Sequence, residues 1–120
     1  EINATDFNHS MLEQGFMPPH TGTFVKRHLF SVYGDFDETY RISGDYEWLL
    51  RVLKTDVSTK YWDKKICTMT VGGASNASLK ARFIGLLEDF RAISRHNVTR
   101  RSLLKKKIKA THSYLRVIRK

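Results

Sequence analysis

The segment of this chain best suited to chemistry is residues 43–48, Ser-Gly-Asp-Tyr-Glu-Trp. Ser43 is a good N-cap, which places Asp45 in the first turn of a predicted helix. The unpaired amide donors and the helix dipole at that position favour an ionised carboxylate, so Asp45 could act as a base. The other interpretation is that Asp45 only stabilises the helix end, which is the common role of a first-turn acid.

Most neighbours of Asp45 also allow both a functional and a structural interpretation. Gly44 leaves space beside the carboxylate. Tyr46 and Trp48 could offer flat apolar faces that suit a sugar ring, or they could belong to the hydrophobic core. Glu47 could help to orient a substrate, or it could lie on a solvated helix face.

Helical periodicity predicts the element that carries this segment. After Ser43 the apolar residues recur at the i, i+3, i+4, i+7 spacing of an amphipathic helix: Tyr46, Leu49, Leu50 and Leu53. Arg51 follows Glu47 by four residues, so a helix ion pair explains Arg51 without a function.

Two further helices are predicted on either side. Residues 26–33 should form a short helix that ends at Gly34, because glycine can adopt a left-handed conformation. A long helix should begin at Asn76 or Ser78 and close at residues 95–97. Its apolar stripe is Leu79, Phe83, Leu86, Leu87, Phe90 and Ile93.

Residues 21–25, 57–62 and 66–71 have the composition of short strands. The predicted fold class is therefore α/β, in the form of a mixed α+β fragment with few strands flanked by helices. About three short strands make a thin sheet for an independent domain, so we expect part of a larger one. The chain begins at Glu1 without an initiator Met, which agrees with a cut piece.

Four segments carry a resemblance to a known family. They are residues 19–30 (PHTGTFVKRHLF), 33–40 (YGDFDETY), 44–51 (GDYEWLLR) and 72–75 (GGAS). In this order they resemble the second, acceptor-side half of family 2 glycosyltransferases, over roughly residues 17–97. The resemblance implies a GT-A fold, with residues 1–97 as the acceptor-side part of the catalytic domain and residues 98–120 as a basic tail.

The resemblance implies an inverting glycosyltransferase. Such an enzyme moves a sugar from a nucleotide-sugar donor to a hydroxyl of a glycan or lipid-linked acceptor, in polysaccharide or glycoconjugate synthesis for the cell envelope. Asp45 matches the base that takes the proton of the acceptor hydroxyl. The residues expected near the substrates are His20, Thr21, Gly44, Glu47 and Trp48. Many members have Glu where this chain has Gly44, a departure that leaves the base in place. The donor-binding half is missing, so this fragment should be inactive alone.

The resemblance also implies a divalent metal, Mg or Mn, in the full-length enzyme. The family holds its metal through an Asp-x-Asp motif in the half that precedes this region. Residues 35–37, Asp-Phe-Asp, fit that pattern by letter, but by the resemblance they belong to an acceptor-side loop. The five histidines lack the close spacing of a zinc site. We therefore expect no metal on this chain.

Positive charge gathers at the C-terminal end. Of the 21 Lys/Arg residues, 9 lie in residues 100–120, a stretch without an acid, while residues 1–99 carry 12 of each sign. An apolar helical stripe runs through this basic tail at Leu104, Ile108, Leu115 and Ile118. The alternative function is therefore a basic module that docks on an anionic membrane surface or a partner, and a solvated helix is the plainer reading. The balanced charge of residues 1–99 argues against nucleic acid.

The cellular compartment is predicted from two features that the sequence lacks. No apolar run is long enough to span a bilayer, and no signal peptide is visible, so we expect a cytoplasmic protein that is peripheral at the inner membrane face if the tail binds lipid. Cys67 is the single cysteine, so an intramolecular disulfide is impossible and a buried thiol is expected.

Overall fold

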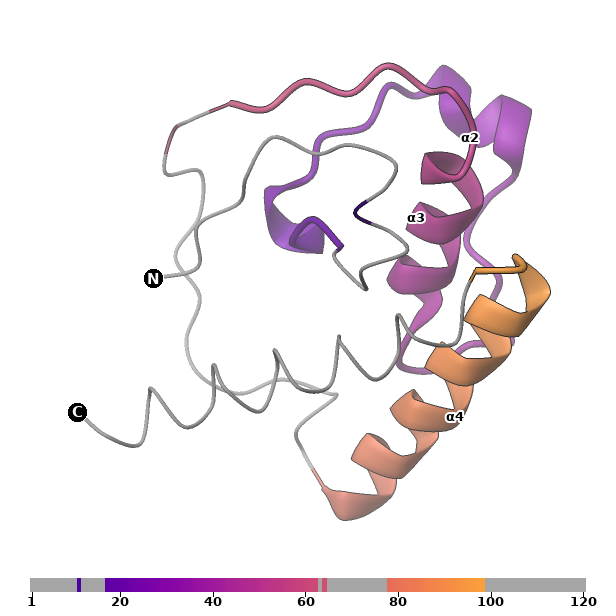
Figure 1. Cartoon of the computed structure of the whole chain (residues 1–120). Helices are drawn as coiled ribbons and strands as arrows, with labels where there is room; N and C mark the ends of the chain where they lie inside the picture. The colour runs from indigo at the N-terminus through magenta and orange to yellow at the C-terminus, as the bar shows by residue number, and fades with distance from the viewer. Residues whose placement is uncertain (1–10, 12–16, 63, 65–77, 99–120) are drawn as a thin grey trace.

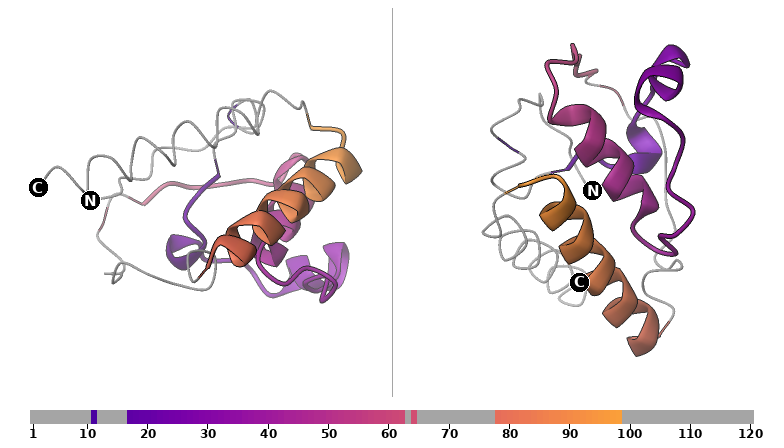
Figure 2. Two further views of the ribbon diagram at one scale, coloured as in Figure 1. Left: turned by 90° about the horizontal axis from the view of Figure 1, so that it is seen from below. Right: turned by 90° about the vertical axis from the view of Figure 1, so that its right-hand side faces the viewer.

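The computed structural model describes residue 11 and residues 17–62, 64 and 78–98. These residues form a 3-10 helix, η1 (His20–Gly22), and three longer helices, α2 (His28–Tyr33), α3 (Gly44–Leu53) and α4 (Leu79–Arg95). Helix α3 contacts both α2 and α4 and lies between them (Figure 1 and Figure 2). The three helices predicted from periodicity are confirmed.

Helix α3 supplies most of the hydrophobic core. The core residues that it contributes are Tyr46, Trp48, Leu49, Leu50, Val52 and Leu53. Ala92 and Ile93 of α4, both fully buried, pack against this cluster. Because burial of one large apolar side chain stabilises a fold by about 1.5–3 kcal/mol, α3 is the element that holds its two neighbours in place.

Ser43 precedes α3 as predicted, but its hydroxyl does not cap the helix. Ser43 Oγ instead donates a hydrogen bond to the main-chain oxygen of Gly85, at 3.3 Å. A Cβ added at Gly85 would lie 3.0 Å from Ile42 Cγ2, so α4 passes very close to the segment before α3. The residue that was predicted to start α3 therefore ties α4 to α3.

Both ends of α4 follow simple capping chemistry. Ser78 is the N-cap, and its Oγ accepts a hydrogen bond from Ala81 N at 3.0 Å. At the other end Asn97 has φ 54°, and Val98 N donates to Ile93 O at 3.1 Å. This six-to-one bond after a left-handed residue is a Schellman motif, with asparagine in place of the usual glycine. Of the two caps predicted for this helix, Asn76 and Ser78, the structure has Ser78.

Most of the predicted apolar stripe of α4 lies outside the core, and Ile93 is its one residue that is fully buried there. The buried residues of α4 are Gly85, Glu88, Ala92 and Ile93, whereas Leu79, Phe83, Leu87 and Phe90 are exposed. Because Gly85 has no side chain, α4 can lie close to Ile42 and Ser43, just before α3, while the larger apolar residues lie on its outer side.

The mixed α/β fold class is wrong for the part of the chain that the structure describes. Residues 17–62, 64 and 78–98 contain helices, turns and loops but no strand. Residues 57–62 were predicted as a strand, yet they run as an irregular and mostly exposed segment. A strand needs a partner for its main-chain hydrogen bonds, and the described residues offer none. The strand predicted over residues 66–71 and the helix in the basic tail lie outside the described residues.

The strand predicted over residues 21–25 is replaced by a turn. Pro19 O accepts hydrogen bonds from Gly22 N at 3.0 Å and from Thr23 Oγ1 at 2.7 Å. Proline holds its own backbone in a fixed conformation, and the threonine hydroxyl competes with sheet pairing for main-chain acceptors. The result is η1, which carries His20.

Candidate functional site

Four rings from separate segments form one aromatic cluster beside α3. The rings of Phe30 and Trp48 stack with their centroids 4.6 Å apart and an angle of 25° between planes. Phe36 lies 5.7 Å from each of these two rings, and His20 meets Phe36 edge-on at 6.3 Å. Trp48 is fixed further because its Nε1 donates to Gly34 O at 2.7 Å.

This cluster lines a small pocket of about 270 Å³, which we call the aromatic pocket. Its walls are His20, Thr23, Phe24, Val25, Phe30, Phe36, Trp48 and Leu49. Flat apolar rings with a few polar groups at the edge suit the faces of a sugar better than a strongly charged ligand. The structure therefore brings together His20 and Trp48, two of the residues expected near the substrates.

Asp45 lies one helical turn before this pocket. It precedes Trp48 by three residues and Leu49 by four, so the three residues share one face of α3. Asp45 is half-buried, and its Oδ1 accepts a hydrogen bond from Tyr46 N at 2.7 Å. The first-turn position is as predicted. Asp45 does not itself line the aromatic pocket; its carboxylate belongs to the same helix face at the N-terminal end.

The remaining substrate candidates lie elsewhere. Thr21 is exposed in η1, but it does not line the aromatic pocket. A Cβ added at Gly44 would lie 3.7 Å from Tyr40 Cβ and 3.9 Å from Asp37 O. These are ordinary contact distances with the preceding loop, and Gly44 does not line the aromatic pocket.

Glu47 points to a different side of α3 and is 1% exposed, so the solvated position expected for it is wrong. Its Oε2 accepts from Arg51 Nη2 at 3.0 Å, and its Oε1 lies 2.7 Å from His96 Nε2. The predicted pair with Arg51 is confirmed. Arg51 Nη1 also donates to Tyr33 O at 2.8 Å, at the end of α2. These contacts give Glu47 a place in the buried framework of the fold.

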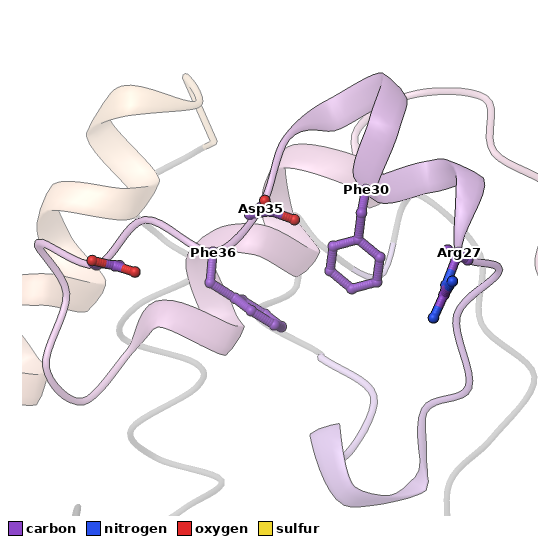
Figure 3. A pocket seen from close by; sticks show the side chains of 5 residues that line it. Arg27, Phe30, Asp35 and Phe36 are labelled. Atoms are coloured by element: carbon purple, nitrogen blue, oxygen red, sulfur yellow. The ribbon is translucent and has the colours of Figure 1, made fainter.

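A second pocket shares Phe30 and Phe36 with the aromatic pocket. It measures about 520 Å³ and is lined by Arg27, Phe30, Asp35, Phe36 and Glu38. Figure 3 shows both phenylalanine rings turned into the space, with Arg27 beyond Phe30 on the side away from Phe36. Phe30 and Phe36 therefore form a wall shared by both pockets. Sequence reasoning did not single them out, although both lie in the segments that carry the family resemblance.

The Asp35-Phe36-Asp37 segment does not fit a divalent metal. Asp37 Oδ1 accepts from Thr39 Oγ1 at 2.6 Å and from Thr39 N at 3.0 Å, while Arg95 Nη1 donates to Asp37 Oδ2 at 2.7 Å. These hydrogen bonds, the Thr39 hydroxyl first, lower the pKa of Asp37 to about 2. Both carboxylate oxygens are thus used, and the guanidinium would repel a cation. Among the residues that the structure describes, no group of three His, Cys, Asp or Glu side chains is placed to bind a metal ion.

Glu88 holds the segment that leads into α3. Its Oε1 accepts from Arg41 N, and its Oε2 accepts from Ile42 N and Ser43 N, each at 2.8 Å. Burial opposes the charged form, but the three main-chain donors outweigh it and hold the pKa of Glu88 below its usual value. Glu88 therefore fixes the start of the helix that carries Asp45. The sequence offered a faint signal, because small residues flank Glu88 one turn away on either side, at Gly85 and Ala92.

Comparison of the chain with models of protein families, with curated proteins and with solved structures found no match. Among the described residues, no helix is both long and apolar enough to cross a membrane.

Proposed function

We propose that this chain is the acceptor-side part of an inverting glycosyltransferase, with the acceptor sugar in the aromatic pocket and Asp45 as the base. The observation that carries the proposal is the shared face of α3, on which Asp45 lies one turn from Trp48 and Leu49 of the pocket wall. The resemblance of residues 17–97 to family 2 glycosyltransferases supports the same reaction class.

The proposed reaction needs one carboxylate at the acceptor. Asp45 takes the proton from an acceptor hydroxyl, the oxygen bonds to the anomeric carbon of a nucleotide-sugar, and the nucleoside diphosphate leaves with inversion. The position of Asp45 in the first turn of α3, on the face that reaches the pocket wall, supports this role. The binding sites for the nucleotide-sugar donor, and for the divalent metal that assists departure of the nucleoside diphosphate, are assigned to residues outside this chain.

The rings around the pocket would hold the acceptor in place. Phe36 is 44% exposed, so part of its ring is available to a ligand. Trp48 is 1% exposed, and its ring packs against those of Phe30 and Phe36. His20 is exposed at the edge of the same pocket, where an imidazole can hydrogen-bond to a sugar hydroxyl. Orienting a bound hydroxyl toward a base is a large part of such catalysis.

The test is Asp45→Asn in the complete enzyme, with release of nucleoside diphosphate measured over a panel of nucleotide-sugars and glycan acceptors. Asparagine keeps the oxygen that accepts from Tyr46 N, so α3 should stay intact while proton transfer is lost. We expect the transfer rate to fall by about 10²-fold or more, with saccharide binding unchanged. Asp56→Asn, at an exposed position after α3, is the matched control and should keep full activity. Normal turnover by Asp45→Asn would remove Asp45 from the mechanism.

A further inference from the structure

One side of α4 is apolar and exposed over most of its length. Leu79 is 83% exposed, Phe83 60%, Leu87 54% and Phe90 43%. Steps of four, four and three residues place these side chains in one row along the helix. Three of the four buried residues of α4, Gly85, Glu88 and Ala92, occupy the opposite side, and the helix packs against α3 (Figure 2). Isolated exposed apolar residues are normal on protein surfaces, whereas a continuous row marks an interaction site.

Basic side chains border this row. Lys80 and Arg91 follow Leu79 and Phe90 in sequence, and at 100° per residue both fall along the edge that Leu87 shares. The guanidinium of Arg91 lies over the ring of Tyr40, 4.7 Å from its centroid, which fixes its position. The opposite edge carries one base and one acid, Arg82 and Asp89.

Of the two acids of α4, Glu88 is turned away from the exposed side. The carboxylate of Glu88 points into the protein, where it binds the main chain of residues 41–43. The outer side of α4 therefore combines large apolar side chains with net positive charge. This is the composition of a helix that lies in the interface of an anionic membrane.

We propose that this side of α4 docks on an anionic lipid surface. Phe83 and Leu87 enter the boundary between headgroups and acyl chains, and Lys80 meets the lipid phosphates, while Arg91, held over the Tyr40 ring, adds positive charge at the same edge. The formal net charge of +9 favours this occupant over a second copy, because two copies repel each other while each is attracted to anionic lipid. The 9 Lys/Arg of residues 100–120 follow α4 closely in sequence and strengthen that attraction. This inference does not depend on the role of Asp45.

Cosedimentation of the full chain with lipid vesicles tests the proposal. The vesicles contain phosphatidylcholine alone or phosphatidylcholine mixed with phosphatidylserine. We expect binding to the mixed vesicles only, weakened by salt. The double variant F83S/L87S should bind the mixed vesicles at least about tenfold more weakly than the wild type, because two inserted apolar side chains are lost. Val32→Ser, at a 67% exposed apolar position on α2, is the matched control and should bind like the wild type.

The outcomes separate the possible occupants of this surface. If F83S/L87S binds the mixed vesicles as tightly as the wild type, the basic tail acts alone and the proposal is overturned. If the wild type ignores both vesicles but forms dimers that F83S/L87S disrupts, measured by light scattering, the surface belongs to a second copy. Failure to bind vesicles without dimer formation also overturns the proposal. Circular dichroism of each variant confirms that the helices persist.

Discussion

Glu47 Oε1 lies 2.7 Å from His96 Nε2, and this contact joins the middle of α3 to the residue that ends α4. The side chains are 1% and 7% exposed. The second oxygen of Glu47 accepts from Arg51, which in turn donates to Tyr33 at the end of α2. One carboxylate thus connects three helices, although its position on α3 was expected to be exposed to solvent.

Removal of this carboxylate should destabilise the fold. Glu47→Ala leaves the buried ring of His96 without its partner, and the partly exposed guanidinium of Arg51 keeps only its main-chain acceptors. Breaking a buried pair by removing one partner costs about 3–5 kcal/mol, and we expect a loss in the free energy of unfolding near the lower end of that range. Urea denaturation followed by circular dichroism measures it.

Glu38→Ala is the comparison for this variant, because Glu38 is an exposed glutamate in the loop before α3. Its effect should stay within about 0.5 kcal/mol. Similar losses for the two variants would mean that the contact of Glu47 with His96 contributes little. A double-mutant cycle with His96→Ala then measures the coupling directly.

Glu88→Gln should weaken the connection between α4 and the start of α3. The carboxylate accepts three main-chain N–H bonds, whereas an amide has one acceptor oxygen and would turn an NH₂ group toward an N–H donor. At least one buried donor then loses its partner, so we expect a loss of about 2 kcal/mol in unfolding free energy. Amide hydrogen exchange should rise at Arg41, Ile42 and Ser43. Unchanged exchange at these three amides would contradict the arrangement.

Acid should destabilise the protein through Asp37. The hydroxyl and amide of Thr39, followed by Arg95, lower its pKa from the ordinary value of 3.8 to about 2. A folded-state pKa below the unfolded one means that the stabilisation is complete above about pH 4 and is lost as the pH falls toward 2. Glu88, whose pKa is also lowered, adds to the same trend.

The measurement is urea denaturation at a series of pH values. Asp37→Asn should show a shallower loss of stability between about pH 4 and pH 2 than the wild type, because one of the two groups no longer titrates. Asp56→Asn, at an exposed position, should keep the wild-type slope. Equal slopes for wild type and Asp37→Asn would show that the bonds from Thr39 and Arg95 do not hold this carboxylate.

Phe36→Ala should weaken saccharide binding without unfolding the chain. Phe36 is partly exposed and forms the wall shared by both pockets, so its loss removes a stacking surface while the stacked pair of Phe30 and Trp48 remains. We expect about tenfold weaker binding of neutral disaccharides. Tryptophan fluorescence in a Trp62→Phe background reports on Trp48, and Val32→Ala serves as the control. Equal affinities in both variants would place the sugar elsewhere.

The sequence predicted the helices well because their signals are local. The spacing of Tyr46, Leu49, Leu50 and Leu53, the cap at Ser78 and the turn glycine at Gly34 act within one or two helical turns. Gly34 has φ 80° and its N–H donates to Phe30 O, as a residue that ends a helix should. Asp45 was likewise placed correctly in the first turn of α3.

Strands were predicted wrongly because a strand is stable only with a partner that the local sequence does not reveal. Residues 57–62 have the composition of a strand, yet no other described segment pairs with them. At residues 21–25 a local turn replaces the predicted strand, because Pro19 O accepts hydrogen bonds from Gly22 N and Thr23 Oγ1.

The sequence by itself determined that the three longer helices form, approximately where each begins and ends, and that an acid stands in the first turn of α3. Only the tertiary structure decided which faces are buried and which distant groups meet. The apolar row of α4 faces outward, while Gly85 lies against Ile42 just before α3 and Ala92 is buried in the core. Glu47 and His96 are 49 residues apart, and Asp37 and Arg95 are 58 apart. Such pairs depend on the packing of whole helices, which no local pattern encodes.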